Sequence, residues 1–380
     1  MQQNNMHILH LIKTSEGATW AINQIKELSK RYPSLTFSAI LPDNGRHIEE
    51  YKAVCRNVYI FEYKLNSSFF SKGKIFKEIV KKDNPDVIHS WFTQTTLYAR
   101  FFLRGLKIPR LFQVVGPLHL ENKIFKFFDI ISAQKNDYWI ATSKYIYDKY
   151  SNSGVPTSKL FLNYAYIDVE EMLVKKQKTE VWDLKKHYNI PENYKIIGTA
   201  SYIYPPKFYE NKGLKGHEEL LEAFREILKV RKDVILVIAG STFGENKTYE
   251  NKLVEMGKAI DEKRIFFTGK YTNVYSVIAN FDVFVYLSKS ENLGGVFESL
   301  LFEVPTVSSN RGALPELVIN GFSGYNVELE KKDLIVSKIL QTLDTENKEM
   351  IVNGKNKVQE LFQKDKLIQN ALEIYQKVNQ

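Results

Sequence analysis

Short apolar runs of strand length alternate with longer amphipathic stretches along most of this chain. The runs are rich in Val, Ile and Phe, and the stretches between them have the apolar spacing of helices. Alternating strands and helices favour parallel, doubly wound α/β sheets. The predicted strands of the first half span residues 7–12, 35–41, 57–61, 86–91, 110–115 and 138–142. Those of the second half span residues 194–199, 233–240, 264–269, 281–287, 305–309 and 323–327.

A polar, lysine-rich stretch over residues 167–188 separates the two halves. A chain of 380 residues, of which 44% are hydrophobic, is long and apolar enough for two or three folded domains. We therefore expect an N-terminal Rossmann-like domain over residues 1–170 and a C-terminal one over residues 171–363. A helical segment over residues 364–380 follows them.

Residues 287–316, LSKSENLGGVFESLLFEVPTVSSNRGALPE, combine a strand end, a glycine turn, a helix and another strand. This order places a ligand site beyond the carboxyl end of the first strand. Gly294 and Gly295 lack the Cβ that would block a phosphate or a sugar, and the helix after them exposes unpaired N–H groups. Glu298 could accept two hydrogen bonds from a ribose diol, and Glu291 could accept from sugar hydroxyls. For Glu298 alone, the alternative is a carboxylate that only favours a helix N-terminus.

The same segment resembles the donor-site signature of the family 4 retaining glycosyltransferases, which have the two-domain GT-B fold. In that family a Glu, Gly-Phe-Gly and a second Glu precede Gly-x-Pro-Val and a later Gly-Gly-x-Pro-Glu. Residues 298–305 and 312–316 keep this register. The family has seven residues between the two Glu and this chain has six, so an ungapped alignment puts Ser290 at the first position. We prefer Glu291, because ENLG matches Glu-Gly-Phe-Gly locally with a one-residue deletion.

A second segment, IIGTASYIYPPKFYENKGLKGHEELLEAF, resembles the first strand and helix of that family's nucleotide-binding domain. The family's Lys-Gly-His-x-x-Leu-Leu begins here at Lys215, so the resemblance implies that Lys215 clamps the donor diphosphate. Thr199 stands where the family usually has an Arg. Lys207 or Lys212 could supply that charge, since a flexible ammonium reaches a phosphate as a point charge. A solvated loop lysine is the alternative for each of them.

The resemblance implies transfer of a hexose or N-acetylhexosamine from a nucleoside diphosphate sugar, with retention of configuration. The acceptor would be a hydroxyl of a glycan or lipid-linked glycan, in cell-surface polysaccharide synthesis. Lys215 and the backbone amides of Gly294 and Gly295 would stabilise the leaving diphosphate, with Leu293 also in the substrate-binding turn, while Glu291 would hold the donor sugar. No cofactor besides the donor and no bound metal are implied.

The first domain would then carry the acceptor contacts. Glu16 and Gly17 follow the first strand and open a helix, so this turn could approach a ligand closely. A plain tight turn is the alternative for Gly17. His119, just past a glycine-proline turn, is the candidate for binding the transferred sugar or positioning the acceptor, with a surface histidine as the alternative. The helical run over residues 364–377 is expected to pack on the first domain, as in the family.

The net positive charge lies in the first half. Residues 1–165 contain 23 Lys and Arg against 13 Asp and Glu, and the remainder contains 30 against 31. Basic and aromatic residues interleave over residues 69–82, 99–107 and 121–130. This pattern can dock on an anionic membrane surface. The alternative is a set of amphipathic helices with Phe in the core and Lys outside.

Cys55 is the only cysteine, which excludes an intrachain disulfide and fits a reducing compartment. The sequence has no run of eighteen apolar residues and no signal-like segment. We therefore expect a cytoplasmic protein, peripheral on the inner face of the membrane.

Two other classes stay open. A nucleotide-sugar epimerase or hydrolase on the GT-B scaffold would turn over the donor without an acceptor. A non-catalytic nucleotide-sugar-binding protein would bind the donor and release no nucleotide. Nucleic-acid binding is not predicted, because the second half is not basic and no recognition module is present. A nicotinamide dehydrogenase is disfavoured, because no Gly-x-Gly-x-x-Gly follows a strand.

Overall fold

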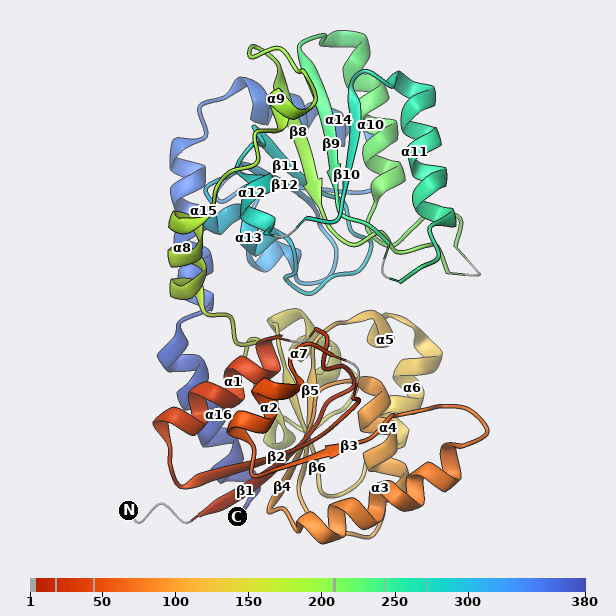
Figure 1. Cartoon of the computed structure of the whole chain (residues 1–380), viewed down its shortest axis with the longest axis vertical. Coiled ribbons are helices and arrows are strands. Elements are labelled where there is room, and N and C mark those ends of the chain that lie inside the picture. Colours follow the sequence, from red (N-terminus) through yellow and green to blue (C-terminus); the bar gives the residue numbers. More distant parts are fainter. Residues whose placement is uncertain (1–4, 18, 44, 208–209, 243, 272) are drawn as a thin grey trace. The chain divides into compact units, whose positions relative to one another are not determined.

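The computed structural model describes residues 5–17, 19–43, 45–207, 210–242, 244–271 and 273–380. The chain folds into two compact units. Unit 1 comprises Met1–Val169 with Phe362–Gln380, and unit 2 comprises Glu170–Leu361. In each unit a parallel sheet carries helices on both faces (Figure 1).

Unit 1 is built on a seven-stranded sheet with the order β3-β2-β1-β4-β5-β6-β7. The strand order reverses between β1 and β4, which pair in parallel with Leu11 opposite Ser90. The strands are β1 (Met6–Leu11), β2 (Leu35–Leu41), β3 (Asn57–Ile60), β4 (Val87–Ser90), β5 (Arg110–Val114), β6 (Asp137–Ala141) and β7 (Leu160–Leu162). The helices are α1 (Thr19–Arg31), α2 (Ile48–Val54), α3 (Phe69–Asp83), α4 (Thr93–Phe102), α5 (Leu118–Glu121), α6 (Lys123–Ile131), α7 (Lys144–Ser151), the short η1 (Thr157–Lys159) and α16 (Lys364–Val378).

Each face of this sheet has its own apolar core, because successive strand residues point to opposite sides. Ile8 packs on the face covered by α1, α2 and α16, and Leu9 packs on the face covered by α3, α4 and α7. The last helix, α16, contributes Ile368, Leu372 and Tyr375 to the first of these cores. The C-terminal helix is therefore part of unit 1.

Unit 2 is built on a six-stranded sheet with the order β10-β9-β8-β11-β12-β13, which reverses between β8 and β11. The strands are β8 (Lys195–Ala200), β9 (Val234–Ala239), β10 (Ile265–Gly269), β11 (Val283–Tyr286), β12 (Thr306–Ser309) and β13 (Tyr325–Val327). The helices are α8 (Val169–Lys178), α9 (Leu184–His187), α10 (His217–Val230), α11 (Thr248–Asp261), α12 (Val274–Ile278), α13 (Val296–Leu301), the short η2 (Leu314–Glu316), α14 (Lys332–Asp344) and α15 (Lys348–Leu361). Every strand predicted from the sequence is present, and the two doubly wound sheets confirm the α/β fold class.

The reversals in strand order locate the expected binding sites. In open parallel sheets, ligands bind beyond the carboxyl ends of the strands at the point where the order reverses. The loops after β1 and β4 hold this position in unit 1, and the loops after β8 and β11 hold it in unit 2. Among the helices that the structure describes, none is both long and apolar enough to span a bilayer.

Candidate active site

Two loops of unit 2 bring Lys215 and Glu291 together. Lys215 lies in the loop between β8 and α10, and Glu291 lies in the loop between β11 and α13. The ammonium of Lys215 forms an ion pair with the Glu291 carboxylate and donates to the Tyr286 hydroxyl at 3.0 Å. The side chains of Lys215 and Glu291 are only 12% and 16% exposed. The predicted diphosphate clamp and the predicted sugar-binding carboxylate therefore form one cluster.

Tyr286 links the two charged groups. Its hydroxyl donates to Glu291 Oε2 at 2.7 Å, and burial raises the pKa of this phenol above its usual value. The Lys215 ammonium also lies 5.5 Å from the ring centroid of Tyr286 and 5.9 Å from that of Tyr204. Sequence reasoning missed Tyr286, because an aromatic residue at the end of a buried strand has the pattern of a core residue. Its place as the last residue of β11 was the available signal.

The loop that carries Lys215 packs against the residues that follow β11, Leu287 to Lys289. Gly216 has φ 71°, and a Cβ at this residue would lie 2.0 Å from the backbone oxygen of Leu287. Lys289 also donates its backbone N–H to the Leu214 carbonyl at 2.9 Å. His217 is buried, and burial lowers the pKa of its imidazole to about 4. The Lys-Gly-His motif thus fixes two loops to each other and holds Lys215 at the site.

The glycine turn packs directly on Tyr286. Gly295 has φ 82°, and a Cβ there would lie 2.8 Å from the Tyr286 ring, so both the backbone and the packing require glycine. A Cβ on Gly294 would lie 3.3 Å from Glu291 Oε1. Leu293 is 4% exposed and its side chain points into the core. Any contact of Leu293 with a ligand is therefore through its backbone.

The second motif, Gly312-Ala313-Leu314-Pro315-Glu316, supports the backbone of Glu291. Ala313 donates its N–H to the Glu291 carbonyl at 3.0 Å. Gly312 has φ 60°, and a Cβ there would lie 1.9 Å from the same oxygen. Ser290 instead turns inward, where its hydroxyl is buried without a hydrogen-bond partner among the described residues. This geometry favours Glu291 over Ser290 as the first carboxylate position.

Glu298 lies half-buried in the first turn of α13. Its carboxyl has no hydrogen-bond or ion-pair partner within the described part of the chain. Burial raises the pKa of Glu298 to about 7, and the charge of Glu298 adds to the effect of burial in raising the pKa of nearby Tyr271. A partly buried carboxylate without donors is ready to accept them from a ligand.

The two lysines proposed to replace the missing Arg differ in their surroundings. Lys212 lies 2.8 Å from Glu222 and 4.0 Å from Glu219, so acidic residues of α10 hold it. The Lys207 ammonium lies 3.9 Å from Glu210, a longer and weaker pairing, and residues 208–209 lie outside the described residues.

The candidates of unit 1 lie in the loops after β1 and β5. A Cβ on Gly17 would meet no atom within 4 Å, so the turn has open space beside it. Glu16 is held by Arg46, whose backbone N–H donates to Glu16 Oε2 at 3.0 Å. His89, at the end of a predicted strand, is buried and bonds Tyr375 at 2.7 Å, and burial lowers its pKa to about 3. His89 is thus a core residue.

His119 lies on α5 at the edge of a buried network. Its Nε2 lies 3.2 Å from the Tyr150 hydroxyl and 3.6 Å from Asp129 Oδ2. Although burial alone would raise the pKa of Asp129, hydrogen bonding to His119 and the charge of Arg100 lower it to about 2. Asp129 therefore stays ionised and holds His119, with 16% of the imidazole side chain still exposed.

Comparisons with known proteins find similarity to glycosyltransferases. Residues 180–357 match the model of the family "glycosyl transferases group 1". The N-acetyl-alpha-D-glucosaminyl L-malate synthase of Bacillus anthracis is 24% identical over 78% of this chain and 76% of its own length. The capsular polysaccharide biosynthesis glycosyltransferase CapM of Staphylococcus aureus is 24% identical over 94% and 93%. The structure of Anabaena Alr3699/HepE in complex with UDP and glucose superposes with TM-score 0.77, at 16% identity over 97% of this chain and 99% of its own.

Proposed function

We propose that this chain, which has the GT-B fold and matches the group 1 glycosyltransferase model over residues 180–357, is a retaining glycosyltransferase that uses a nucleoside diphosphate sugar. It moves a hexose or N-acetylhexosamine to a hydroxyl of a glycan or lipid-linked glycan. The observation that carries the proposal is the cluster of Lys215, Glu291 and Tyr286 at the strand-order reversal of unit 2. Beside it lies Glu298, which has no hydrogen-bond or ion-pair partner among the described residues.

Each group of this cluster has a role in binding the donor. Lys215 neutralises the diphosphate, and the N–H groups of the glycine turn at Gly294 and Gly295 approach it without a Cβ in the way. Glu291, now paired with Lys215, accepts hydrogen bonds from the sugar hydroxyls. Glu298 accepts from the ribose diol, which supplies the donors that its carboxylate lacks.

The reaction breaks the bond between the anomeric carbon and the diphosphate oxygen and forms a bond from that carbon to the acceptor oxygen. Negative charge develops on the leaving diphosphate, so Lys215 and the turn amides stabilise the transition state. Glu291 is committed to Lys215 and Tyr286, which argues against a covalent nucleophile. The leaving phosphate accepts the acceptor proton, and retention follows from attack on the face that the diphosphate leaves. His119 of unit 1 positions the acceptor, and no metal or cofactor takes part.

The relative named for capsular polysaccharide biosynthesis supports a role in cell-surface polysaccharide synthesis. We place the enzyme in the cytoplasm, peripheral on the inner face of the membrane. Nucleoside diphosphate sugars are the donor class, and the nucleotide complex of the Anabaena structure supports that choice.

A donor screen by thermal shift tests this function. A nucleoside diphosphate sugar at 100 times its Kd raises the stability of the native state by about 2.7 kcal/mol. We expect one donor to shift the wild type, no shift with Glu298→Ala, and a normal shift with Glu346→Ala, a matched change at an exposed residue of the same unit.

Acceptor assays with the selected donor then separate the classes of enzyme. We expect nucleotide release to depend on an acceptor, to persist in EDTA, and to give a product with the anomeric configuration of the donor. Release at the same rate without an acceptor would instead establish a hydrolase or epimerase. Donor binding without release, across a panel of glycan and lipid-linked glycan acceptors, would establish a non-catalytic binding protein.

A further inference from the structure

Helix α6 is amphipathic, but its acidic residue faces the interior of unit 1 and most of its apolar residues face outward. Its one buried residue is Asp129, whose carboxylate contacts Arg100 at 2.6 Å and Tyr150 at 2.8 Å. Ile130 is partly buried against the core of unit 1, and the other five apolar side chains of α6 face outward, each more than half exposed. They are Ile124 (66%), Phe125 (62%), Phe127 (57%), Phe128 (58%) and Ile131 (64%). The sequence-based alternative, with Phe in the core and Lys outside, is therefore wrong for this helix.

The apolar surface continues over two neighbouring helices. Phe70 of α3 and Phe101 of α4 are 64% and 55% exposed, and their ring centroids lie 5.7 Å apart. Leu97 and Phe101 of α4 line the same pocket as Ile131 of α6. We define the α3–α4–α6 face by the exposed apolar residues Phe70, Leu97, Phe101, Ile124, Phe125, Phe127, Phe128 and Ile131.

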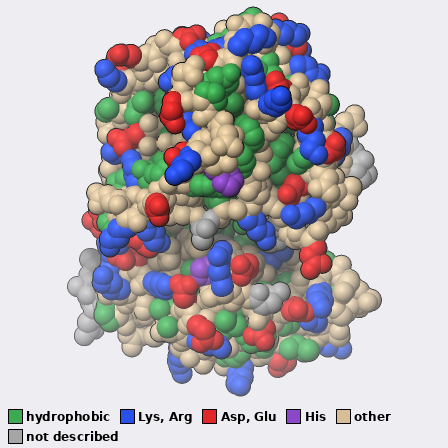
Figure 2. All heavy atoms as spheres, turned by 45° about the horizontal axis from the view of Figure 1, so that its top comes forward, with side chains coloured by type: hydrophobic (Ala, Val, Ile, Leu, Met, Phe, Trp, Pro, Cys, Tyr) green, Lys and Arg blue, Asp and Glu red, His purple; other side chains and the backbone are tan. Residues whose placement is uncertain are grey.

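Uncompensated positive charge accompanies this face. Arg104, Lys107, Lys123 and Lys126 lie on or next to α4 and α6, and none has an ion-pair partner within the described part of the chain. On the surface shown in Figure 2, by contrast, Lys and Arg side chains are interspersed with Asp and Glu side chains. The charge of the α3–α4–α6 face is therefore complementary to an anionic partner.

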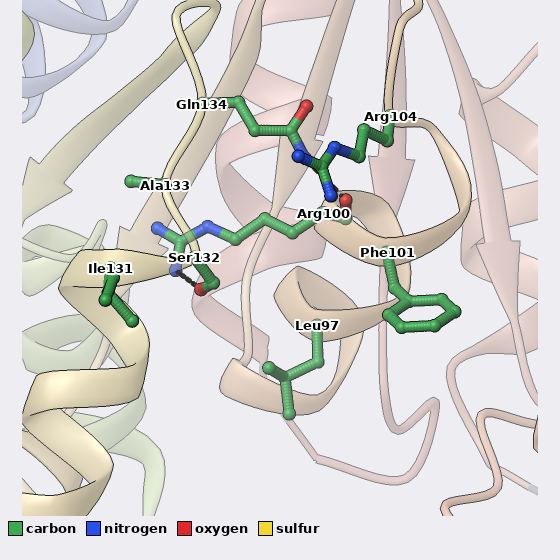
Figure 3. A pocket seen from close by; sticks show the side chains of 8 residues that line it. All are labelled: Leu97, Arg100, Phe101, Arg104, Ile131, Ser132, Ala133 and Gln134. Carbon is green, nitrogen blue, oxygen red and sulfur yellow. Dashed lines mark hydrogen bonds between the residues drawn. The ribbon is translucent and has the colours of Figure 1, made fainter.

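A pocket of about 370 Å³ lies between α4 and the end of α6 (Figure 3). Arg104 and Gln134 lie together at one end of it, and Phe101 and Leu97 lie at the other. Arg100 also lines the pocket, but its charge is balanced by Asp129 and Asp137. Arg104 is thus the cation that the pocket offers to a ligand. The pocket combines one cationic end with one apolar end, as a phospholipid combines a phosphate with a hydrocarbon chain.

We propose that the α3–α4–α6 face docks on a bilayer that is rich in anionic phospholipid. Helix α6 lies in the interface with its apolar side chains inserted, and the flanking cations face the headgroups. The pocket takes a headgroup phosphate at Arg104 and the start of an acyl chain over Leu97 and Phe101.

The shape of the face favours a bilayer over a protein partner. Five apolar side chains of α6 project from it, each with more than half of its surface exposed. The hydrocarbon region of a bilayer can deform to bury all of these side chains, whereas a protein partner would need a complementary pocket for each of them. The unpaired lysines add attraction to a negatively charged leaflet, which falls as salt screens it.

The inner side of the same helix connects docking to the acceptor site. Asp129 of α6 lies 3.6 Å from the imidazole of His119, which we assign to positioning the acceptor. For lipid-linked acceptors, and resting on the proposed function, docking through α6 brings the bilayer next to His119. The bilayer would then present the acceptor to the enzyme.

Vesicle co-sedimentation of the full chain, without donor, tests the docking. We expect binding to vesicles of phosphatidylglycerol and phosphatidylcholine to exceed binding to phosphatidylcholine alone by about tenfold, and to weaken with salt. The double variant Phe125→Ser with Phe128→Ser should lose about tenfold or more, because two inserted side chains are removed. Arg104→Glu should lose the preference for the anionic vesicles. Val230→Ser with Val352→Ser, a matched pair on exposed positions of unit 2, should bind as the wild type does.

Donor-induced thermal shifts of the same variants separate this proposal from the proposed function. We expect every variant to keep the wild-type melting temperature and donor shift, since none touches the donor site. Wild-type binding that is equal on both vesicle types, or unchanged in the double variant, would overturn the docking surface. A dimer that the double variant dissociates, with no vesicle binding, would assign the face to a second copy of the chain and also overturn it.

Discussion

The Glu298→Gln variant removes the charge of a half-buried carboxylate and keeps the shape of the side chain. Burial raises the pKa of Glu298 from its usual 4.5 to about 7. Between these two values the folded protein keeps a proton that the unfolded chain has released, so the free energy of unfolding falls as pH rises from about 4.5 to about 7. At about 1.36 kcal/mol per pKa unit, this carboxylate makes the fold about 3 kcal/mol less stable at pH 8 than at pH 4.

We therefore expect Glu298→Gln, which carries no charge at any pH, to be more stable than the wild type at pH 8 and nearly equal to it at pH 4.5. Urea unfolding without donor, followed by far-UV circular dichroism at each pH, measures the free energy of unfolding of the two proteins. The control is Glu303→Gln, because ion pairs with Lys176 and Lys355 lower the pKa of Glu303. Its effect should have the opposite sign, a loss of stability at pH 8. A gain for Glu298→Gln that is the same at both pH values would refute the reasoning.

The same variant should bind the donor more weakly. A hydrogen bond to a charged group contributes about 1.5–3 kcal/mol, so the loss of one ribose contact to the carboxylate weakens binding by roughly 10- to 150-fold. The wild-type affinity should rise as pH increases through about 7, because the ionised form accepts the ribose hydroxyls. Isothermal titration at pH 6 and pH 8 measures both effects. The Glu298 carboxylate would thus lower the stability of the fold while it strengthens donor binding.

Three further variants test the cluster in unit 2. Tyr286→Phe removes the hydroxyl that contacts Lys215 and Glu291, and should lower kcat/KM by about tenfold or more with little change in melting temperature, in steady-state kinetics. Lys215→Ala removes the cation of the site and leaves Glu291 without its ion pair. In titrations, this variant should lose more affinity for a nucleoside diphosphate than for the nucleoside, and equal losses for both would contradict a diphosphate contact. Gly295→Ala places a Cβ 2.8 Å from the Tyr286 ring at φ 82° and should cost about 1–3 kcal/mol in urea unfolding, whereas Gly105→Ala, also at positive φ but with open space, should cost less.

The alternation of apolar strand-length runs with amphipathic helical stretches was sufficient to predict the α/β fold class. Buried parallel strands are continuous apolar runs, and their limits fall within two residues of those predicted, as for β2 and β11. The donor segment was also recognisable, because a strand, a glycine turn and a helix follow one another along the chain. Local sequence order decides both features, so they did not depend on distant contacts.

The choice of residues within the site depended on distant contacts. The local ENLG match preferred Glu291 over Ser290, and the contacts that favour the same residue are the ion pair with Lys215, 76 positions away, and the backbone support from Gly312 and Ala313. Tyr286 had the pattern of a core residue until its hydroxyl was placed between two charges. Pairing between loops of a doubly wound sheet is set by strand order, which the sequence pattern does not contain.

Helix α6 shows most clearly what the sequence determined and what the tertiary structure decided. Its sequence determined an amphipathic helix with Phe and Ile on one side, and the interleaved lysines indicated a contact with an anionic surface. Only the tertiary structure decided which side faces outward, because the charge of Asp129 is satisfied by Arg100 and by Tyr150, which come from α4 and α7. Once Asp129 faces inward, a buried carboxylate needs these partners, and the phenylalanines on the opposite side of the helix lie on the surface.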